Sequence, residues 1–147
     1  MKIRQANFKD LEAISIIFDE YRQFYKQNSD ITSAKLFLRN RFEHLQSIFF
    51  ICEEGDRILG FTHLYPVFSS ISMKRSYILN DLFVRPEHRK KHIAKQLIAE
   101  AKEYVRFMDG KGLELSTAKD NDPAQSLYKS ENFHKEEDFI TFFWSKS

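Results

Sequence analysis

The sequence predicts an α/β fold in which a central sheet is flanked by helices, with one domain spanning residues 1–147. Three observations support this prediction. Apolar side chains near the N-terminus recur at helical spacing, and the segment from Ile48 to Tyr65 is typical of a strand hairpin. Tyr77–Ala101 passes from a strand through a short turn into an amphipathic helix. A chain of 147 residues with 42% hydrophobic content is long enough to bury one core.

The N-terminal part is predicted to form a strand followed by two helices. Lys2–Arg4 is the short strand. Asn7 is a helix cap, and Asp10, three residues later, completes a weaker form of the capping box. The residues that follow keep the 3.6-residue period of an amphipathic helix. A second helix is expected to be capped by Thr32 or Ser33.

The middle of the chain is predicted to form an antiparallel hairpin. Ile48–Glu53 is a strand by composition, the turn lies at Gly55, and Arg57–Tyr65 returns as the second strand. Pro66 is expected to end this strand because proline cannot donate to a sheet ladder. Phe68–Arg75 is then a loop that leads into the central strand.

Strands and helices are predicted to alternate in the C-terminal half. Tyr77–Val84 is the central strand, and the amphipathic helix begins after Arg89. Leu113–Thr117 is expected to be a buried strand, and Asp122 with the proline after it opens a short helix. Residues from Phe133 onward are predicted to form a final strand or strand pair.

Two adjacent polar residues, Asn80 and Asp81, lie within the central strand. In a regular strand Asp81 shares a face with Tyr77 and Phe83, whereas Asn80 points to the opposite face. Only a β-bulge would turn Asp81 to the other side of the sheet.

Composition restricts the classes of function. Lys and Arg total 23 against 21 Asp and Glu, so a nearly neutral chain gives little support to nucleic-acid binding. The only cysteine, Cys52, forms no internal disulfide and lies in an apolar run, which favours a buried side chain and a cytoplasmic location. No apolar run approaches the length of a membrane span, and the N-terminus lacks the apolar core of a signal peptide.

The turn between the central strand and its helix is the most informative segment. Its N–H groups at the helix start have no internal partner, and it carries several cations, so it is suited to hold a phosphate. The segment RKKHIA from Arg89 and the segment NDPAQSLY from Asn121 resemble the two motifs of the GNAT family of N-acetyltransferases, Arg/Gln-x-x-Gly-x-Gly/Ala and Asn-x-x-Ala-x-x-x-Tyr. His92 and Asn132 stand where that family has glycine.

The resemblance covers nearly the whole chain, and the order β-α-α-β-β-β-α-β-α-β matches that fold. It implies a mixed central sheet whose central strands splay apart, and acetyl-CoA as the cosubstrate, with no metal. By resemblance, the turn amides hold the diphosphate, the central strand pairs with the pantetheine arm, and an N–H near Leu82 or Phe83 faces the thioester oxygen. The cofactor-binding residues implied are Leu82, Phe83, Val84, Arg89, Lys90, Lys91, His92, Ile93, Ala94, Asn121, Ala124 and Tyr128.

Two catalytic roles follow from the resemblance. Tyr128 would donate its phenolic proton to the departing thiolate. The general base is open, because relatives that act on polyamines often carry a glutamate where this chain has Asn80, which cannot take a proton. Either Asp81 takes the proton through water, or the amine loses it to solvent; Asp81 as a structural carboxylate is an equal alternative.

The acceptor site is expected between the first two helices and the hairpin. A carboxylate among aromatic rings suits a cationic amine, although each of these residues alone fits an ordinary core or surface position equally well. The candidates are Glu20, Tyr21, Phe24, Tyr25, Tyr65 and Asn80.

The leading function is direct acetyl transfer to a primary amine in a ternary complex, since no cysteine is placed to carry the acyl group. The segments HLYPVFSS and YILNDLFV resemble a bacterial branch similar to histone and polyamine acetyltransferases, so a small amine, a polyamine and a protein lysine all stay open. The alternative is a non-catalytic acyl-CoA-binding or regulatory module. Relatives often dimerise through their C-terminal strands, which makes a homodimer possible.

Overall fold

A computed structural model describes residues 1–146, which divide into two compact units. The first unit runs from Met1 to Ser116 and the second begins at Thr117; each is described by itself. The first unit contains β1 (Lys2–Gln5), a 3₁₀ turn η1 (Phe8–Asp10), α1 (Leu11–Phe24), α2 (Ile31–Glu43), β2 (Ile48–Glu54), β3 (Arg57–Ser69), β4 (Lys74–Val84), a 3₁₀ turn η2 (Pro86–His88), α3 (Ile93–Phe107) and β5 (Leu113–Glu114), and the second contains α4 (Asp122–Ser130).

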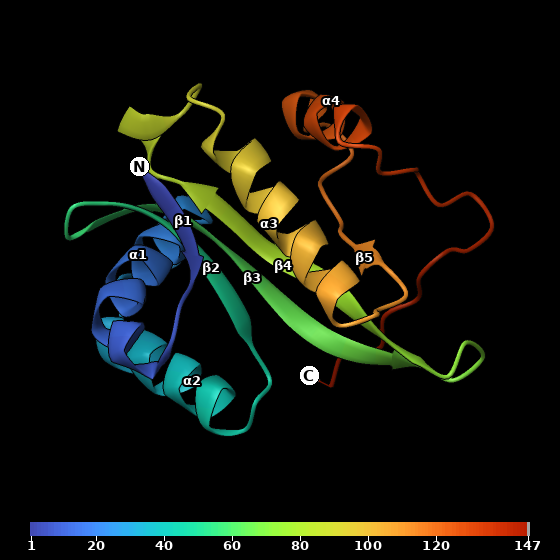
Figure 1. The fold of residues 1–147 in the computed structure, drawn as a ribbon, viewed down its shortest axis with the longest axis horizontal. Helices are drawn as coiled ribbons and strands as arrows, with labels where there is room; N and C mark the ends of the chain where they lie inside the picture. The colour runs from blue at the N-terminus through green and yellow to red at the C-terminus, as the bar shows by residue number, and fades with distance from the viewer. Residues whose placement is uncertain (147) are drawn as a thin grey trace. The chain divides into compact units, whose positions relative to one another are not determined.

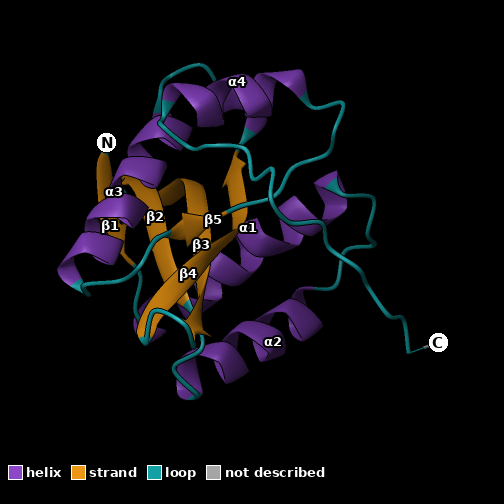
Figure 2. Cartoon of the chain, turned by 90° about the vertical axis from the view of Figure 1, so that its right-hand side faces the viewer, coloured by secondary structure: helices purple, strands orange, loops and turns teal. Residues whose placement is uncertain are grey.

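The first unit is built on a five-stranded sheet in the order β1-β2-β3-β4-β5. The first three pairings are antiparallel and β4 pairs with β5 in parallel, so the sheet is mixed. Helices α1 and α2 cover one face, and α3 covers the other (Figures 1 and 2). This arrangement confirms the predicted α/β class with a mixed central sheet.

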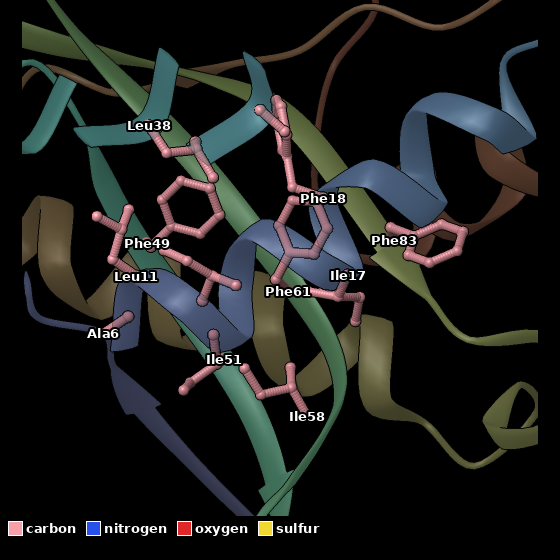
Figure 3. Packing of buried hydrophobic residues seen from close by; sticks show 12 residues of the cluster. Ala6, Leu11, Ile17, Phe18, Leu38, Phe49, Ile51, Ile58, Phe61 and Phe83 are labelled. Carbon is pink, nitrogen blue, oxygen red and sulfur yellow. The ribbon is translucent and has the colours of Figure 1, made fainter. Parts of the chain in front are cut away.

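The main core lies between the sheet and the pair α1 and α2 (Figure 3). It forms because the apolar stripes of both helices meet the inward-facing residues of β2 and β3. Phe49, Phe61 and Leu38 are fully buried at its centre. Aromatic rings pack against one another here, since the rings of Phe49 and Phe61 lie 5.4 Å apart between centroids and are tilted by 33°.

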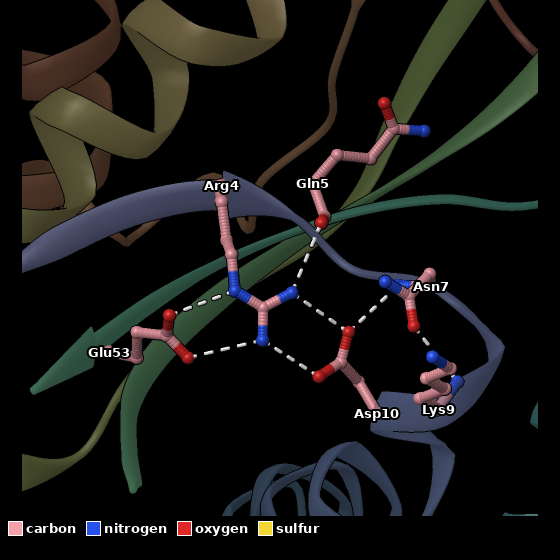
Figure 4. Close-up of polar contacts among 6 residues, drawn as sticks. All are labelled: Arg4, Gln5, Asn7, Lys9, Asp10 and Glu53. Atoms are coloured by element: carbon pink, nitrogen blue, oxygen red, sulfur yellow. Dashed lines mark hydrogen bonds and ion pairs between the residues drawn. The ribbon is translucent and has the colours of Figure 1, made fainter. Parts of the chain in front are cut away.

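The predicted capping box at the N-terminus is confirmed (Figure 4). The Asn7 side chain accepts from the Lys9 N–H at 2.9 Å, and the Asn7 N–H donates to Asp10 at 2.8 Å. Arg4 then donates to both Asp10 and Glu53, which ties η1 to the first two strands. Hydrogen bonds from this guanidinium hold the pKa of both carboxyl groups below their usual range.

Three boundaries predicted from the sequence were wrong. Asp30, rather than Thr32 or Ser33, caps α2, and it accepts from the Ser33 N–H at 3.1 Å. Strand β3 continues through Pro66 to Ser69, so the predicted loop shrinks to the residues between Ser69 and Lys74. Proline is tolerated there because β2 pairs with β3 only as far as Leu64, which leaves Pro66 on an open edge.

The second unit contains the predicted short helix, α4, but not the predicted final strand. After α4 the chain turns at Asn132, which has φ +66°. The Phe133 N–H donates to the Tyr128 carbonyl at 3.0 Å and the Asn132 N–H to the Lys129 carbonyl at 3.1 Å, which is a Schellman motif. Asparagine therefore ends the helix as expected. Residues 133–146 contain no strand, and β5 is also shorter than predicted.

Candidate active site

The turn that follows β4 presents a row of unpaired amides. The N–H groups from Lys90 to Ala94 donate to no backbone carbonyl within the described residues, and α3 begins at Ile93. Lys90 and His92 both have left-handed backbone conformations, with φ of +64° and +62°. Left-handed residues in a turn are one way in which successive backbone N–H groups form a concavity that binds anions.

The conformation of His92 explains the glycine of the family motif. His92 is the N-cap residue of α3, with φ +62° and ψ +18°. Glycine adopts this conformation without a steric penalty, whereas a residue with a Cβ is strained there. The sequence indicated that His92 is unusual at this position. The structure shows that the backbone conformation also favours glycine here, in addition to the space that a nearby ligand would need.

The first two basic side chains of the motif, Arg89 and Lys90, differ in their contacts. The Nε of Arg89 donates to the Val84 carbonyl at 2.9 Å, and its guanidinium lies over the rings of Phe24 and Phe83. Arg89 therefore folds back onto the end of β4. Lys90 is exposed. The backbone amides, rather than the Arg89 guanidinium, are consequently the main hydrogen-bond donors that this turn could offer to an anion.

One edge of β4 loses its neighbour in the middle of the strand. Strand β5 pairs with β4 only at Tyr77 and Ile78. Beyond Ile78 no strand within residues 1–146 pairs with that edge, while the other edge stays paired with β3 up to Val84. The backbone of Leu82–Val84 thus has a free side on which an extended ligand can add as a strand.

A β-bulge in β4 reorients the residues around it. His63 pairs with Asp81 and Leu64 pairs with Leu79, so Asn80 is the extra residue. The predicted regular alternation was wrong as a result: Tyr77 packs on Tyr104 of α3, whereas Asp81 faces α1 on the opposite side. The bulge turns Asp81 toward the side where the acceptor was expected.

Asp81 is the centre of a buried polar network. It is 7% exposed, and its Oδ1 accepts from the Tyr21 hydroxyl at 2.7 Å and from the Asn80 amide at 3.2 Å. Its Oδ2 lies 2.9 Å from Nδ1 of His63, and Nε2 of His63 lies 2.6 Å from the Ser47 hydroxyl. The network runs from α1 across β4 and β3 to the start of β2.

Burial decides the protonation of this network. Burial lowers the pKa of His63 despite the opposing influence of Asp81, so the imidazole is neutral at pH 7. A neutral ring that donates from Nδ1 to Asp81 accepts from Ser47 at Nε2. Burial, with Asp81 second, raises the pKa of Tyr65 to about 12 and raises that of Tyr21 as well, which keeps both hydroxyls protonated.

His63 and Ser47 were not among the residues selected from the sequence. His63 contacts Asp81, and Ser47 contacts His63, although both are distant from Asp81 along the chain. The only signal was a histidine in an otherwise apolar strand, and that pattern is also typical of a core histidine.

The predicted acceptor residues of the first unit only partly come together. Tyr21 contacts Tyr25 and Phe83, and Phe24 contacts Tyr25 and Phe83, so these rings form one aromatic cluster. Tyr65 lies near the same network, with its ring 4.5 Å from that of His63. Glu20 is instead paired with Arg85 at 2.8 Å, which offsets the charge that it would offer to a cationic amine.

Residues of the second motif lie on α4 in the second unit. Asn121 caps the helix, with its Oδ1 accepting from the Ala124 N–H at 3.2 Å, so only its amide N–H₂ is left to donate to a ligand. Tyr128 lies in the last turn, with its ring centroid 6.0 Å from that of Phe133. The cofactor and proton-donor roles of these residues stay predictions.

Within residues 1–146, no group of three or more His, Cys, Asp or Glu side chains is arranged to bind a metal ion. None of the helices in this part of the chain combines the length and the apolar character required to cross a bilayer.

Comparison with known proteins identifies the family. The model of the acetyltransferase (GNAT) family matches residues 13–133. The chain is 44% identical over 142 residues to the uncharacterized N-acetyltransferase YhfO of Bacillus subtilis, which covers 97% of this chain and 95% of that protein. It is 31% identical over 134 residues to a probable acetyltransferase of Haemophilus influenzae, and the match covers 90% of each chain. A crystal structure of a probable acetyltransferase superposes with a TM-score of 0.94 at 36% identity, covering 100% of this chain and 99% of the other.

The chain belongs to the GNAT family of acetyltransferases. It is an acetyl-CoA-dependent N-acetyltransferase, and the resemblance inferred from the two sequence motifs is confirmed.

Proposed function

We propose that the enzyme acetylates a primary amine by direct attack, with Asp81 as the final proton acceptor and Tyr21 as its relay. The observation that carries this proposal is the 2.7 Å hydrogen bond from the Tyr21 hydroxyl to Asp81, next to the bulge of β4. An aliphatic amine is protonated at neutral pH, so it must lose a proton before it can attack a thioester.

The exposure of the two residues favours a relay over direct contact. Asp81 is 7% exposed, whereas Tyr21 is half-buried and lies on the outer side of the network. The amine donates its proton to the Tyr21 oxygen while the Tyr21 hydroxyl passes its own proton to Asp81. The neutral His63 donates from Nδ1 to the second carboxylate oxygen, which holds the carboxylate in place and leaves Oδ1 facing Tyr21.

The residues of the turn and of β4 fit acetyl-CoA. When bound, this cosubstrate supplies the thioester carbonyl that the amine attacks. The unpaired amides from Lys90 to Ala94 would hold its diphosphate, and the free edge of Leu82–Val84 would pair with its pantetheine amides. A β4 amide at Leu82 or Phe83 would then face the thioester oxygen and stabilise charge that develops there.

Direct transfer is favoured over an acyl-enzyme because the single thiol is unsuited to the chemistry. Cys52 is fully buried in β2, and burial raises the pKa of its thiol. We propose Tyr128 as the proton donor to the departing thiolate; this role is supported by the motif on α4 and by the family to which the chain belongs.

The test compares Asp81→Asn with Asp56→Asn, in which an exposed carboxylate of the hairpin turn is neutralised in the same way. Thiol release from acetyl-CoA is measured with a panel of primary amines. We expect Asp81→Asn to lower kcat/KM by about 10²–10⁴ at pH 7, with a smaller defect near pH 10 where the free amine predominates. Asp56→Asn should match the unchanged enzyme.

Folding and cosubstrate binding are measured alongside, because Asp81 has structural partners. If Asp81→Asn retains both its melting temperature and its acetyl-CoA affinity, and its rate stays within about threefold of the original enzyme, Asp81 is not the proton acceptor. If the original enzyme turns over none of the primary amines in the panel, the proposed acceptor class is contradicted.

A further inference from the structure

An open cavity of about 710 Å³ lies next to the start of β2, where β3 extends past Leu64 without pairing to β2. The last turn of α2 and the far ends of β3 and β4 form its walls. Its lining includes Arg41, His44, Tyr65, Pro66, Phe68 and Arg75, and it is called here the arginine cavity.

The charge of the arginine cavity is unbalanced. Neither Arg41 nor Arg75 forms a side-chain hydrogen bond or an ion pair within residues 1–146, and no Asp or Glu lines the cavity. Other arginines are paired with carboxylates, as Arg4, Arg57 and Arg85 are. Two unpaired guanidinium groups in one concave site favour an anionic ligand.

Both guanidinium groups are prepared for a planar anion. Cζ of Arg41 lies 4.7 Å from the centroid of the Phe37 ring, and that of Arg75 lies 5.4 Å from the Phe68 ring. Stacking on an aromatic face leaves the N–H groups at the guanidinium edge free to donate. The Nε of Arg41 is also shielded from water without a hydrogen-bond partner, and an anion drawn to this edge would offer it one.

The arginine cavity adjoins the network of Asp81. Tyr65 lines the cavity, and its ring lies 4.5 Å from that of His63, which contacts Asp81. Along β4, Arg75 and Asp81 are separated by about 17–20 Å, at about 3.3 Å per residue. A ligand that reaches from Arg75 to Asp81 must therefore be about as long as five or six extended residues.

We propose that the arginine cavity binds an acidic side chain of a peptide acceptor, five or six residues from the amine that is acetylated. This inference rests on the proposed function, since it takes Asp81 as the site of proton transfer. The open edge of β3 beyond Leu64 offers backbone groups to such an extended segment. A polyamine, being cationic, gains nothing from Arg41 and Arg75.

The test uses two hexapeptides with a free N-terminal amine and an amidated C-terminus, which differ only in glutamate or glutamine at the sixth position. Binding to the full chain is measured by calorimetry at low ionic strength, with and without CoA. We expect the glutamate peptide to bind at least about tenfold more tightly, because a charge-assisted hydrogen bond is lost in the other. Arg75→Gln should abolish this preference.

Arg57→Gln is the matched control, because Arg57 is also exposed but lies in the distant hairpin turn, where it pairs with Glu87 at 2.6 Å. This variant should keep the preference for glutamate. Equal binding of the two peptides, or a preference that survives Arg75→Gln, would overturn the inference. Turnover of acetyl-CoA with a small monoamine tests the proposed function separately, since it needs no contact with the cavity.

Discussion

Replacement of His92 by glycine should stabilise the protein and preserve the binding of acetyl-CoA. His92 has φ +62° at the start of α3, a conformation that costs an ordinary residue about 1–2 kcal/mol. Glycine avoids this cost but loses about 0.5–1 kcal/mol more in conformational entropy on folding. The net gain expected for His92→Gly is about 0.5–1 kcal/mol, equivalent to roughly 2–4 °C in melting temperature.

The effect on the ligand follows from the same geometry. Without a Cβ the backbone N–H groups next to residue 92 are open to closer approach by a diphosphate, so affinity should stay equal or increase. Thermal unfolding and calorimetric titration with acetyl-CoA measure the two quantities on the same sample.

Two further variants separate backbone strain from side-chain chemistry. His92→Ala removes the imidazole but keeps the strained conformation, so it should match the original protein in affinity and gain no stability. Asn132→Gly should gain less than His92→Gly, because the short polar side chain of asparagine suits the left-handed conformation at φ +66°. A loss of affinity of tenfold or more in both His92→Gly and His92→Ala would refute the reasoning, because the imidazole would then be a phosphate ligand.

Two other predictions concern proton transfer and pH. Tyr128→Phe should lower kcat by about 10²–10⁴ without weakening acetyl-CoA binding, as measured by stopped assays and calorimetry; an unchanged rate would remove Tyr128 from the mechanism. The free energy of unfolding should fall as the pH drops below about 6.5, by up to about 1.4 kcal/mol per pH unit, because the unfolded chain takes up a proton at His63 that the folded protein, with its lowered pKa, does not. Urea unfolding between pH 7.5 and 5 measures this slope, which should be absent in His63→Gln; carboxylates with lowered pKa, such as Asp10, contribute only below about pH 4.5.

Local sequence signals predicted local structure well. The capping box of Asn7 and Asp10, the turn at Gly55 and the end of α4 at Asn132 all formed as expected, because each depends on residues within one turn of chain. Pro66 shows where such signals fail. A proline excludes a central strand, but this part of β3 is an edge because β2 begins only at Ile48, opposite Leu64, and that depends on the packing of distant segments.

In the candidate site, too, the contiguous part could be predicted from the sequence and the contacts between distant residues could not. The motif that begins at Arg89 predicted the turn and the helix start, since both are contiguous in the chain. The partners of Asp81 were not predictable, because Ser47, His63 and Tyr21 reach it from three other elements. A bulge has no sequence signature strong enough to indicate which residue is the extra one.

The bulge at Asn80 connects the two halves of the proposed chemistry. On one edge, β4 passes beyond its last contact with β5 just before the bulge, and its backbone there becomes available to a ligand. On one face, the same extra residue turns Asp81 away from α3 and toward Tyr21. A strand without the bulge would place this carboxylate among the apolar side chains beneath α3, where its charge would be strongly disfavoured. The inserted residue therefore accounts for the orientation of Asp81 toward Tyr21, next to the strand edge that β5 leaves free, where we propose that Asp81 accepts the proton.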